Sequence, residues 1–258
     1  MPRLQVGTDV SLFYEDVGDG PPVVLVHGWP LSCRFWEPQI GPLVEAGRRV
    51  VCYDRRGFGD SSRPWHGYDH ATFTADLAAL VEALDLTGLT LVGFSTGCAE
   101  AVGYAAASRR VARLVLGSPV VYPDPLADEL QTASRRHRIP MLDDLLLRFF
   151  AVDGYSALDE RTRLYLLGLA AGASPRGTSE SMAAWRSADP AADLSAVTVP
   201  TLIIQGEGDA FVPQQDSGAR LVRAIAGSVL VTIPDAPHGA PLTHDEQWNQ
   251  LLLEFLAS

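Results

Sequence analysis

Short apolar runs, separated by polar segments that contain glycine, alternate along the chain with longer stretches of helical composition. A continuous apolar run of four to eight residues is typical of a strand buried on both faces. Such runs predict six strands, within 23–26, 48–53, 89–92, 111–116, 200–205 and 229–233. An antiparallel hairpin over 4–17 is expected before them. Together these make an α/β fold with a mostly parallel eight-stranded sheet.

Helices are predicted between most of these strands, at 34–45, 73–84, 99–107 and 244–256. From residue 121 to 194 the pattern is helical and carries no strand signal. We interpret 121–194 as a helical cap inserted into a core formed by 1–120 and 195–258. The alternative is a set of helices packed on the sheet. The cap's apolar residues Leu145, Phe149, Phe150 and Leu166 are expected to cover a site at the sheet edge.

Composition narrows the function classes. The chain has 258 residues, 47% of them hydrophobic, which suits a single large domain. Its net charge of −11 argues against nucleic acid as a partner. We expect no signal peptide, because the first residues carry no apolar segment, and no membrane span, because no apolar run is long enough. Three scattered cysteines predict no disulfide framework and a cytoplasmic location. Neither a metal nor another cofactor is expected, and the oligomeric state stays open.

Candidate chemistry begins at the strand over 89–92, which runs into Gly93-Phe94-Ser95-Thr96-Gly97 and then an alanine-rich helix. The Gly-x-Ser-x-Gly pattern alone is weak, and a capping serine is its bland interpretation. A strand before it and a helix after it are the context of a nucleophile elbow, in which the hydroxyl stands exposed at the sheet edge. We therefore take Ser95 as the candidate nucleophile.

A serine hydroxyl needs a base and an orienting acid, which follow it along the chain in this class of site. Asp209 and His238 both lie just after predicted strands, at the edge that Ser95 occupies. Glu207, two residues before Asp209, is the fallback acid. Among the six histidines, His27 looks structural, while His66, His70, His137 and His244 look solvated.

The oxyanion of acyl transfer requires hydrogen-bond donors. We expect the backbone N–H of Thr96, after the nucleophile, and that of Trp29, in the turn after the strand at 23–26. Trp29, Thr96 and Phe211 are also expected to line the substrate pocket. Cys98 is interpreted as a buried filler rather than a redox group.

These motifs resemble the α/β-hydrolase superfamily and, within it, the bacterial cofactor-free haloperoxidase/perhydrolase and aryl-esterase family. The resemblance covers nearly the whole chain. It is carried by the segments HGWPLS (27–32), FWEPQI (35–40), YDRRGFGDSSRPWHGYD (53–69), DLAALVEALDL (76–86), LVGFS (91–95), VPTLIIQGEGDAFVP (199–213) and APHG (236–239). It implies the α/β-hydrolase fold with a Ser95–Asp209–His238 triad and Trp29 and Thr96 as oxyanion donors.

The implied function is hydrolysis of a small carboxylic ester or lactone through an acyl-enzyme, with perhydrolysis as a candidate side activity. Alternatives on the same triad are a lactonase, a C–C hydrolase or a biosynthetic cyclase or isomerase. A ligand receptor that has kept the fold is a different class. Aspartate-dependent dehalogenases and epoxide hydrolases are excluded by Ser95.

Two positions depart from the family pattern GFSMGG, since Thr96 stands in place of Met and Cys98 in place of Gly. The Thr96 amide is retained whatever the side chain. We expect the Thr96 side chain to face the acyl group and to affect substrate preference rather than the chemistry.

Overall fold

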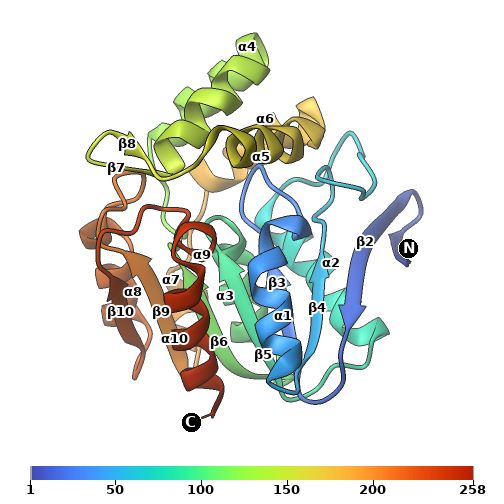
Figure 1. The fold of residues 1–258 in the computed structure, drawn as a ribbon. Coiled ribbons are helices and arrows are strands. Elements are labelled where there is room, and N and C mark those ends of the chain that lie inside the picture. Colours follow the sequence, from blue (N-terminus) through green and yellow to red (C-terminus); the bar gives the residue numbers. More distant parts are fainter. Residues whose placement is uncertain (1, 258) are drawn as a thin grey trace.

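An eight-stranded sheet forms the centre of the computed structural model, which describes residues 2–257 (Figure 1). The strand order is β1-β2-β4-β3-β5-β6-β9-β10. The pairs from β4 to β10 are parallel, and β1 and β2 form the antiparallel edge. The strands are β1 (Arg3–Gly7), β2 (Val10–Val17), β3 (Pro22–Val26), β4 (Arg49–Tyr53), β5 (Leu89–Phe94), β6 (Val111–Gly117), β9 (Thr201–Gly206) and β10 (Val229–Ile233). The predicted mostly parallel sheet is confirmed.

Side chains alternate between the two faces of the sheet, and each face has its own hydrophobic core. On β3, Val23 and Leu25 belong to one core, whereas Val24 and Val26 belong to the other. The first core is covered by α1 (Glu37–Glu45) and α10 (Asp245–Ala257). The second is covered by α2 (His70–Ala83), α3 (Gly97–Ala107), α7 (Ala191–Ala196) and α8 (Gly218–Ala224). The helices are seen on both faces of the sheet in Figure 1.

The chain between β6 and β9 rises above one edge of the sheet (Figure 1). It forms α4 (Leu126–Phe149), α5 (Glu160–Gly172) and α6 (Pro175–Arg186). It also contains a short hairpin, β7 (Ala151–Val152) with β8 (Tyr155–Ser156), where the sequence carried no strand signal. A ladder of two residues per strand is too short to give a detectable alternation. Its turn places Asp153 and Gly154 at positive φ.

The division into core and cap remains a proposal. The suggested boundary at residue 194 falls inside α7. This helix packs against α3 on one face of the sheet, and not above the sheet with α4, α5 and α6. The segment above the sheet therefore ends before Ala191. The helix expected over 34–45 is divided into a 3₁₀ turn, η1 (Cys33–Trp36), and α1. Pro38 lies in the first turn of α1, where its missing N–H costs no helix hydrogen bond. The remaining elements are η2 (Gln214–Asp216) and α9 (Ala240–Thr243).

Candidate active site

Ser95 occupies a strained turn between β5 and α3. Its φ of 53° lies in the left-handed region, which a serine adopts only when the surroundings enforce it. The turn is tight because a Cβ added at Gly93 would lie 2.8 Å from Cys98 Cα, and one at Gly97 would lie 2.7 Å from the His27 carbonyl oxygen. The two glycines of the motif are thus required by backbone contact, and the motif has the strand–turn–helix context that the sequence indicated.

Ser95, His238 and Asp209 are joined by two hydrogen bonds. His238 follows β10 and its Nε2 lies 3.0 Å from Ser95 Oγ, while its Nδ1 lies 2.9 Å from Asp209 Oδ2. Asp209 follows β9. The exposed fractions of Ser95 and His238 are 1%, and that of Asp209 is 5%. Three residues far apart in sequence therefore form one buried chain of hydrogen bonds.

Asp209 is held in a fixed orientation. Its Oδ1 accepts hydrogen bonds from the backbone N–H groups of Phe211, at 3.1 Å, and Val212, at 2.8 Å. This leaves Oδ2 directed at His238. Glu207, the fallback acid, has an exposed side chain and lies earlier in the same turn. The structure therefore brings Asp209, and not Glu207, to His238.

Aromatic rings surround the imidazole of His238. The ring centroids of Phe94, Phe149 and Phe211 lie 5.4, 4.8 and 5.0 Å from that of His238. Phe149 ends α4, and its carbonyl accepts a hydrogen bond from the Gly239 N–H at 3.0 Å. The segment above the sheet thus contacts the imidazole directly. Phe211 lies beside His238, and its place in the substrate pocket stays a prediction.

Trp29 lies in the turn after β3, directly against the nucleophile turn. A Cβ at the preceding residue, Gly28, would lie 2.8 Å from Ser95 Cβ. The backbone N–H of Trp29 donates to Thr96 Oγ1 at 2.9 Å. Trp29 is also tied to α6, because its indole Nε1 donates to the Thr178 carbonyl at 3.0 Å.

The Thr96 side chain makes polar contacts that the sequence did not indicate, and its expected position facing the acyl group stays a prediction. Its hydroxyl oxygen accepts hydrogen bonds from the Trp29 amide and from Arg55 Nη1, at 3.2 Å. The threonine hydroxyl differs in this respect from the thioether of a methionine, which accepts hydrogen bonds only weakly. The polar group of Thr96 is therefore directed at the same amide that the sequence assigned to the oxyanion.

Comparison with known proteins shows the family to which the chain belongs. A family model described as the alpha/beta hydrolase family matches residues 23–251. The chain belongs to the alpha/beta hydrolase family. It is 35% identical to a non-heme chloroperoxidase of Streptomyces lividans over 96% of both chains. It is 33% identical to a bifunctional esterase/perhydrolase of Acinetobacter calcoaceticus, over 96% of this chain and 97% of the relative.

A solved structure agrees with the same family. The crystal structure of a bromoperoxidase from Bacillus anthracis has a TM-score of 0.95 and 40% sequence identity, covering 100% of this chain and 99% of the other. The resemblance to haloperoxidases and perhydrolases noted in the sequence is thereby confirmed, and with it the alpha/beta hydrolase fold.

Sequence reasoning overlooked a buried ion pair in this hydrolase. Arg55 Nη2 contacts Glu100 Oε1, and both side chains are at most 2% exposed. Tyr53 donates to the other carboxylate oxygen of Glu100 at 3.2 Å. Burial raises the pKa of Glu100 to about 7, against the opposing effect of Arg55. The signal available in the sequence was Glu100 itself, a carboxylate in the first turn of an alanine-rich helix that the sheet buries.

His27 is fixed as a neutral, structural histidine. Its Nε2 accepts the backbone N–H of Arg55 at 3.0 Å, and its Nδ1 therefore carries the proton and donates to the Gly28 carbonyl at 2.9 Å. Burial, followed by the charge of Arg55, lowers the pKa of His27 to about 3. The expectation that His70 is solvated is wrong, because both its ring nitrogens are buried and burial lowers its pKa.

The neutral state of His27 predicts a dependence of stability on pH. The unfolded chain protonates His27 near pH 6.5 and the folded protein only near pH 3, so the unfolded state binds more protons between these values. The free energy of unfolding should therefore fall as pH is lowered through this window, by about 1.4 kcal/mol per pH unit from His27.

Urea denaturation of wild type and His27→Gln between pH 7 and pH 4 measures this contribution. The glutamine amide oxygen can accept the Arg55 N–H but does not titrate. The unfolding free energy of wild type minus that of His27→Gln should decrease as pH falls. Groups with the opposite pH dependence, such as Glu100, are present in both proteins and cancel in this difference. A constant difference across the range would mean that His27 is not held neutral.

The structure bears on three further features of the chain, namely metal-binding clusters, cysteines and helices long enough to span a membrane. Among residues 2–257, no group of three or more His, Cys, Asp or Glu side chains is arranged to hold a metal ion. Cys33, Cys52 and Cys98 are buried and unpaired. Cys98 lies with its Sγ 3.5 Å from the Gly117 carbonyl, and burial raises the pKa of its thiol, as suits a filler. In the described part of the chain, no helix combines the length and apolarity that a bilayer span requires.

Proposed function

We propose that this hydrolase cleaves small carboxylic esters through an acyl-enzyme formed on Ser95. The observation that carries the proposal is the unbroken chain of hydrogen bonds from Asp209 through His238 to Ser95. A base 3.0 Å from a hydroxyl, with a carboxylate on its other nitrogen, is the arrangement that activates a serine. The relative named as an esterase/perhydrolase supports the same reaction class.

The acylation step uses each of these groups once. Ser95 Oγ attacks the ester carbonyl carbon while His238 Nε2 takes the hydroxyl proton. Asp209 holds Nδ1–H and stabilises the imidazolium that forms. The carbonyl oxygen becomes an oxyanion, for which the backbone N–H groups of Trp29 and Thr96 are the proposed donors. His238 then returns the proton to the leaving alkoxide, and the alcohol departs.

Deacylation repeats the sequence with water. His238 takes a proton from water, whose oxygen attacks the acyl carbon. The bond from that carbon to Ser95 Oγ then breaks, His238 returns the proton to Oγ, and the acid departs. Hydrogen peroxide in place of water gives the peracid by the same balance, with no metal or redox group required for the transfer. We propose perhydrolysis as a side activity on this basis and on the relatives' names.

Substrate size depends on side chains above the sheet. Ser95 is 1% exposed, so an ester reaches its hydroxyl only when neighbouring side chains separate. Apolar rings lie beside its base, because Phe94, Phe149 and Phe211 surround the imidazole of His238. These contacts favour a small apolar acyl group over a charged one.

The decisive experiment is a panel of p-nitrophenyl acetate, butyrate and octanoate and of aliphatic lactones, each with and without hydrogen peroxide. We expect turnover of a short ester at a rate at least about a thousandfold above Ser95→Ala, because the triad supplies most of the acceleration. Peracid should form from acetate and peroxide only in the protein with Ser95.

Other outcomes of the panel decide among the alternatives. Selectivity for one lactone over every ester would replace the esterase proposal with a lactonase. Absence of turnover on all members, in a folded protein, would contradict the proposal and favour a receptor on the same fold. The intact hydrogen-bond chain argues against a receptor, because ligand binding alone has no need of an imidazole between a carboxylate and a serine.

A further inference from the structure

The hydroxyl of Thr96 has an unused proton beside the nucleophile. Two N–H groups, of Trp29 and of Arg55, point at Thr96 Oγ1 and can only donate to it. A hydroxyl has two acceptor lone pairs and one donor hydrogen. Both lone pairs are thus occupied, and the hydrogen is left to bond elsewhere.

The neighbours of the hydroxyl limit where this proton can point. Thr96 directly follows Ser95, and its oxygen lies 2.9 Å from the Trp29 nitrogen. The Trp29 turn passes so close to Ser95 that a Cβ added at Gly28 would lie 2.8 Å from Ser95 Cβ. The Trp29 N–H, which donates to Thr96 Oγ1 here, would be shared with an oxyanion that it helps to hold, so such an oxyanion would lie beside the Thr96 hydroxyl.

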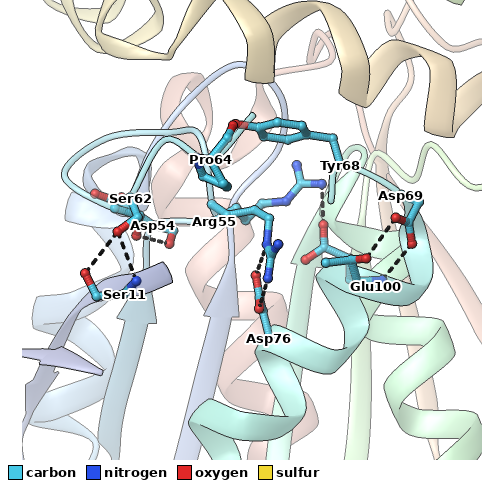
Figure 2. Close-up of polar contacts among 12 residues, drawn as sticks. Ser11, Asp54, Arg55, Ser62, Pro64, Tyr68, Asp69, Asp76 and Glu100 are labelled. Atoms are coloured by element: carbon cyan, nitrogen blue, oxygen red, sulfur yellow. Dashed lines mark hydrogen bonds and ion pairs between the residues drawn. The ribbon is translucent and has the colours of Figure 1, made fainter. Parts of the chain in front are cut away.

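A buried positive charge lies on the far side of the same hydroxyl. The guanidinium of Arg55 stacks 4.2 Å from the Phe73 ring centre and is paired with Glu100 on α3. Figure 2 shows the Glu100 carboxylate joined to Arg55 beneath the loop that follows β4. A hydrogen bond from a cation polarises the hydroxyl that accepts it and makes that hydroxyl a stronger donor.

We propose that the Thr96 hydroxyl is a third donor to the oxyanion of the acyl-transfer intermediate, oriented and polarised by Arg55. The proposal rests on the proposed function and adds a side-chain donor to the two amides. Thr96 then contacts a reacting atom, while Arg55 acts through it as a positioning residue. The threonine at this position takes part in the chemistry, rather than only in acyl selectivity.

The test compares Thr96→Val with Thr96→Ser on the best p-nitrophenyl ester. Valine keeps the shape and the backbone amide but lacks the hydroxyl, and serine restores it. Removal of one oxyanion donor costs on the order of 10²–10³ in kcat, and we expect Thr96→Val to lose about a hundredfold with KM little changed. Thr96→Ser should stay within about tenfold of wild type, far from the loss of a donor.

A binding measurement separates this effect from a folding defect. A trifluoromethyl ketone adds to the serine and gives a tetrahedral oxyanion without turnover. Its inhibition constant should rise in Thr96→Val by the same factor by which kcat/KM falls, as expected of an interaction made in the transition state. A thermal unfolding curve of each variant checks that the protein remains folded at the assay temperature.

The role of Arg55 is tested by a double-mutant cycle. Arg55→Met is combined with Glu100→Gln, so that no unpaired buried charge remains. In the threonine background this pair should lower kcat, and in the Thr96→Val background it should have little further effect. A merely structural role for Arg55 would give equal losses in both backgrounds.

The opposite results are distinct. Equal or faster turnover by Thr96→Val would overturn the inference. A gain in particular would show that Thr96 Oγ1 competes with the oxyanion for the Trp29 amide. In either case ester hydrolysis by wild type would leave the proposed function intact. Absence of ester hydrolysis by wild type itself would overturn both.

Discussion

Ser95→Ala is expected to abolish ester hydrolysis while leaving the fold unchanged. Loss of the triad serine removes both the nucleophile and the acyl-enzyme, and in serine hydrolases this costs on the order of 10⁶ in turnover. The hydroxyl is hydrogen-bonded to His238, and the tight turn is imposed by the close backbone approaches at Gly93 and Gly97. The mutation therefore removes chemistry without removing packing.

Steady-state rates with p-nitrophenyl butyrate, together with circular dichroism and a melting curve, measure this. Thr243→Ala is a matched control, since it also deletes a hydroxyl, but one whose hydrogen bond is to His244 and not to a residue of the triad. Its rate should stay near wild type. Retention by Ser95→Ala of more than about a hundredth of wild-type activity, against the expected factor near 10⁶, would remove Ser95 from the mechanism.

Asp209→Asn should lower turnover by about 10⁴, the size of effect that the wrong histidine tautomer produces. The backbone N–H groups of Phe211 and Val212 both donate to Oδ1. They will keep the asparagine oxygen in that place and turn its NH₂ group toward His238. That NH₂ donates to Nδ1, which leaves the proton on Nε2. A protonated Nε2 cannot accept the proton of Ser95.

Glu207→Gln is the matched control, because it makes the same carboxylate-to-amide change two residues away on an exposed side chain. Its rate should lie within a few-fold of wild type. Comparable losses for the two variants, measured as kcat on one ester, would contradict the assignment of Asp209 as the orienting acid.

The strands and the three residues of the hydrogen-bonded chain could be predicted because local pattern determines them. Apolar runs of four to six residues mark strands buried on both faces, and a parallel sheet brings the residues after their carboxyl ends to one edge. Ser95, Asp209 and His238 each follow such a run. Their meeting thus depended on topology, which strand and helix alternation indicates, and not on the packing of individual side chains.

The surroundings of Thr96 could not be predicted in the same way. Its hydrogen bonds join the ends of β3, β4 and β5, and their geometry depends on how Arg55 is placed by Glu100 and Phe73. No periodicity reports such a contact. The β7–β8 hairpin was missed because two residues per strand give no detectable alternation. The burial of the His70 ring nitrogens was missed because it depends on packing against residues distant in sequence.

The most direct test of the account is the site of covalent modification by a fluorophosphonate, which traps an activated serine as a stable adduct. After reaction with wild type, intact mass and peptide mapping should show one phosphonyl group, on Ser95. Labelling should be lost in Ser95→Ala and strongly slowed in Asp209→Asn. A label on another residue, or efficient ester turnover by a protein whose Ser95 stays unmodified, would contradict an acyl-enzyme on Ser95.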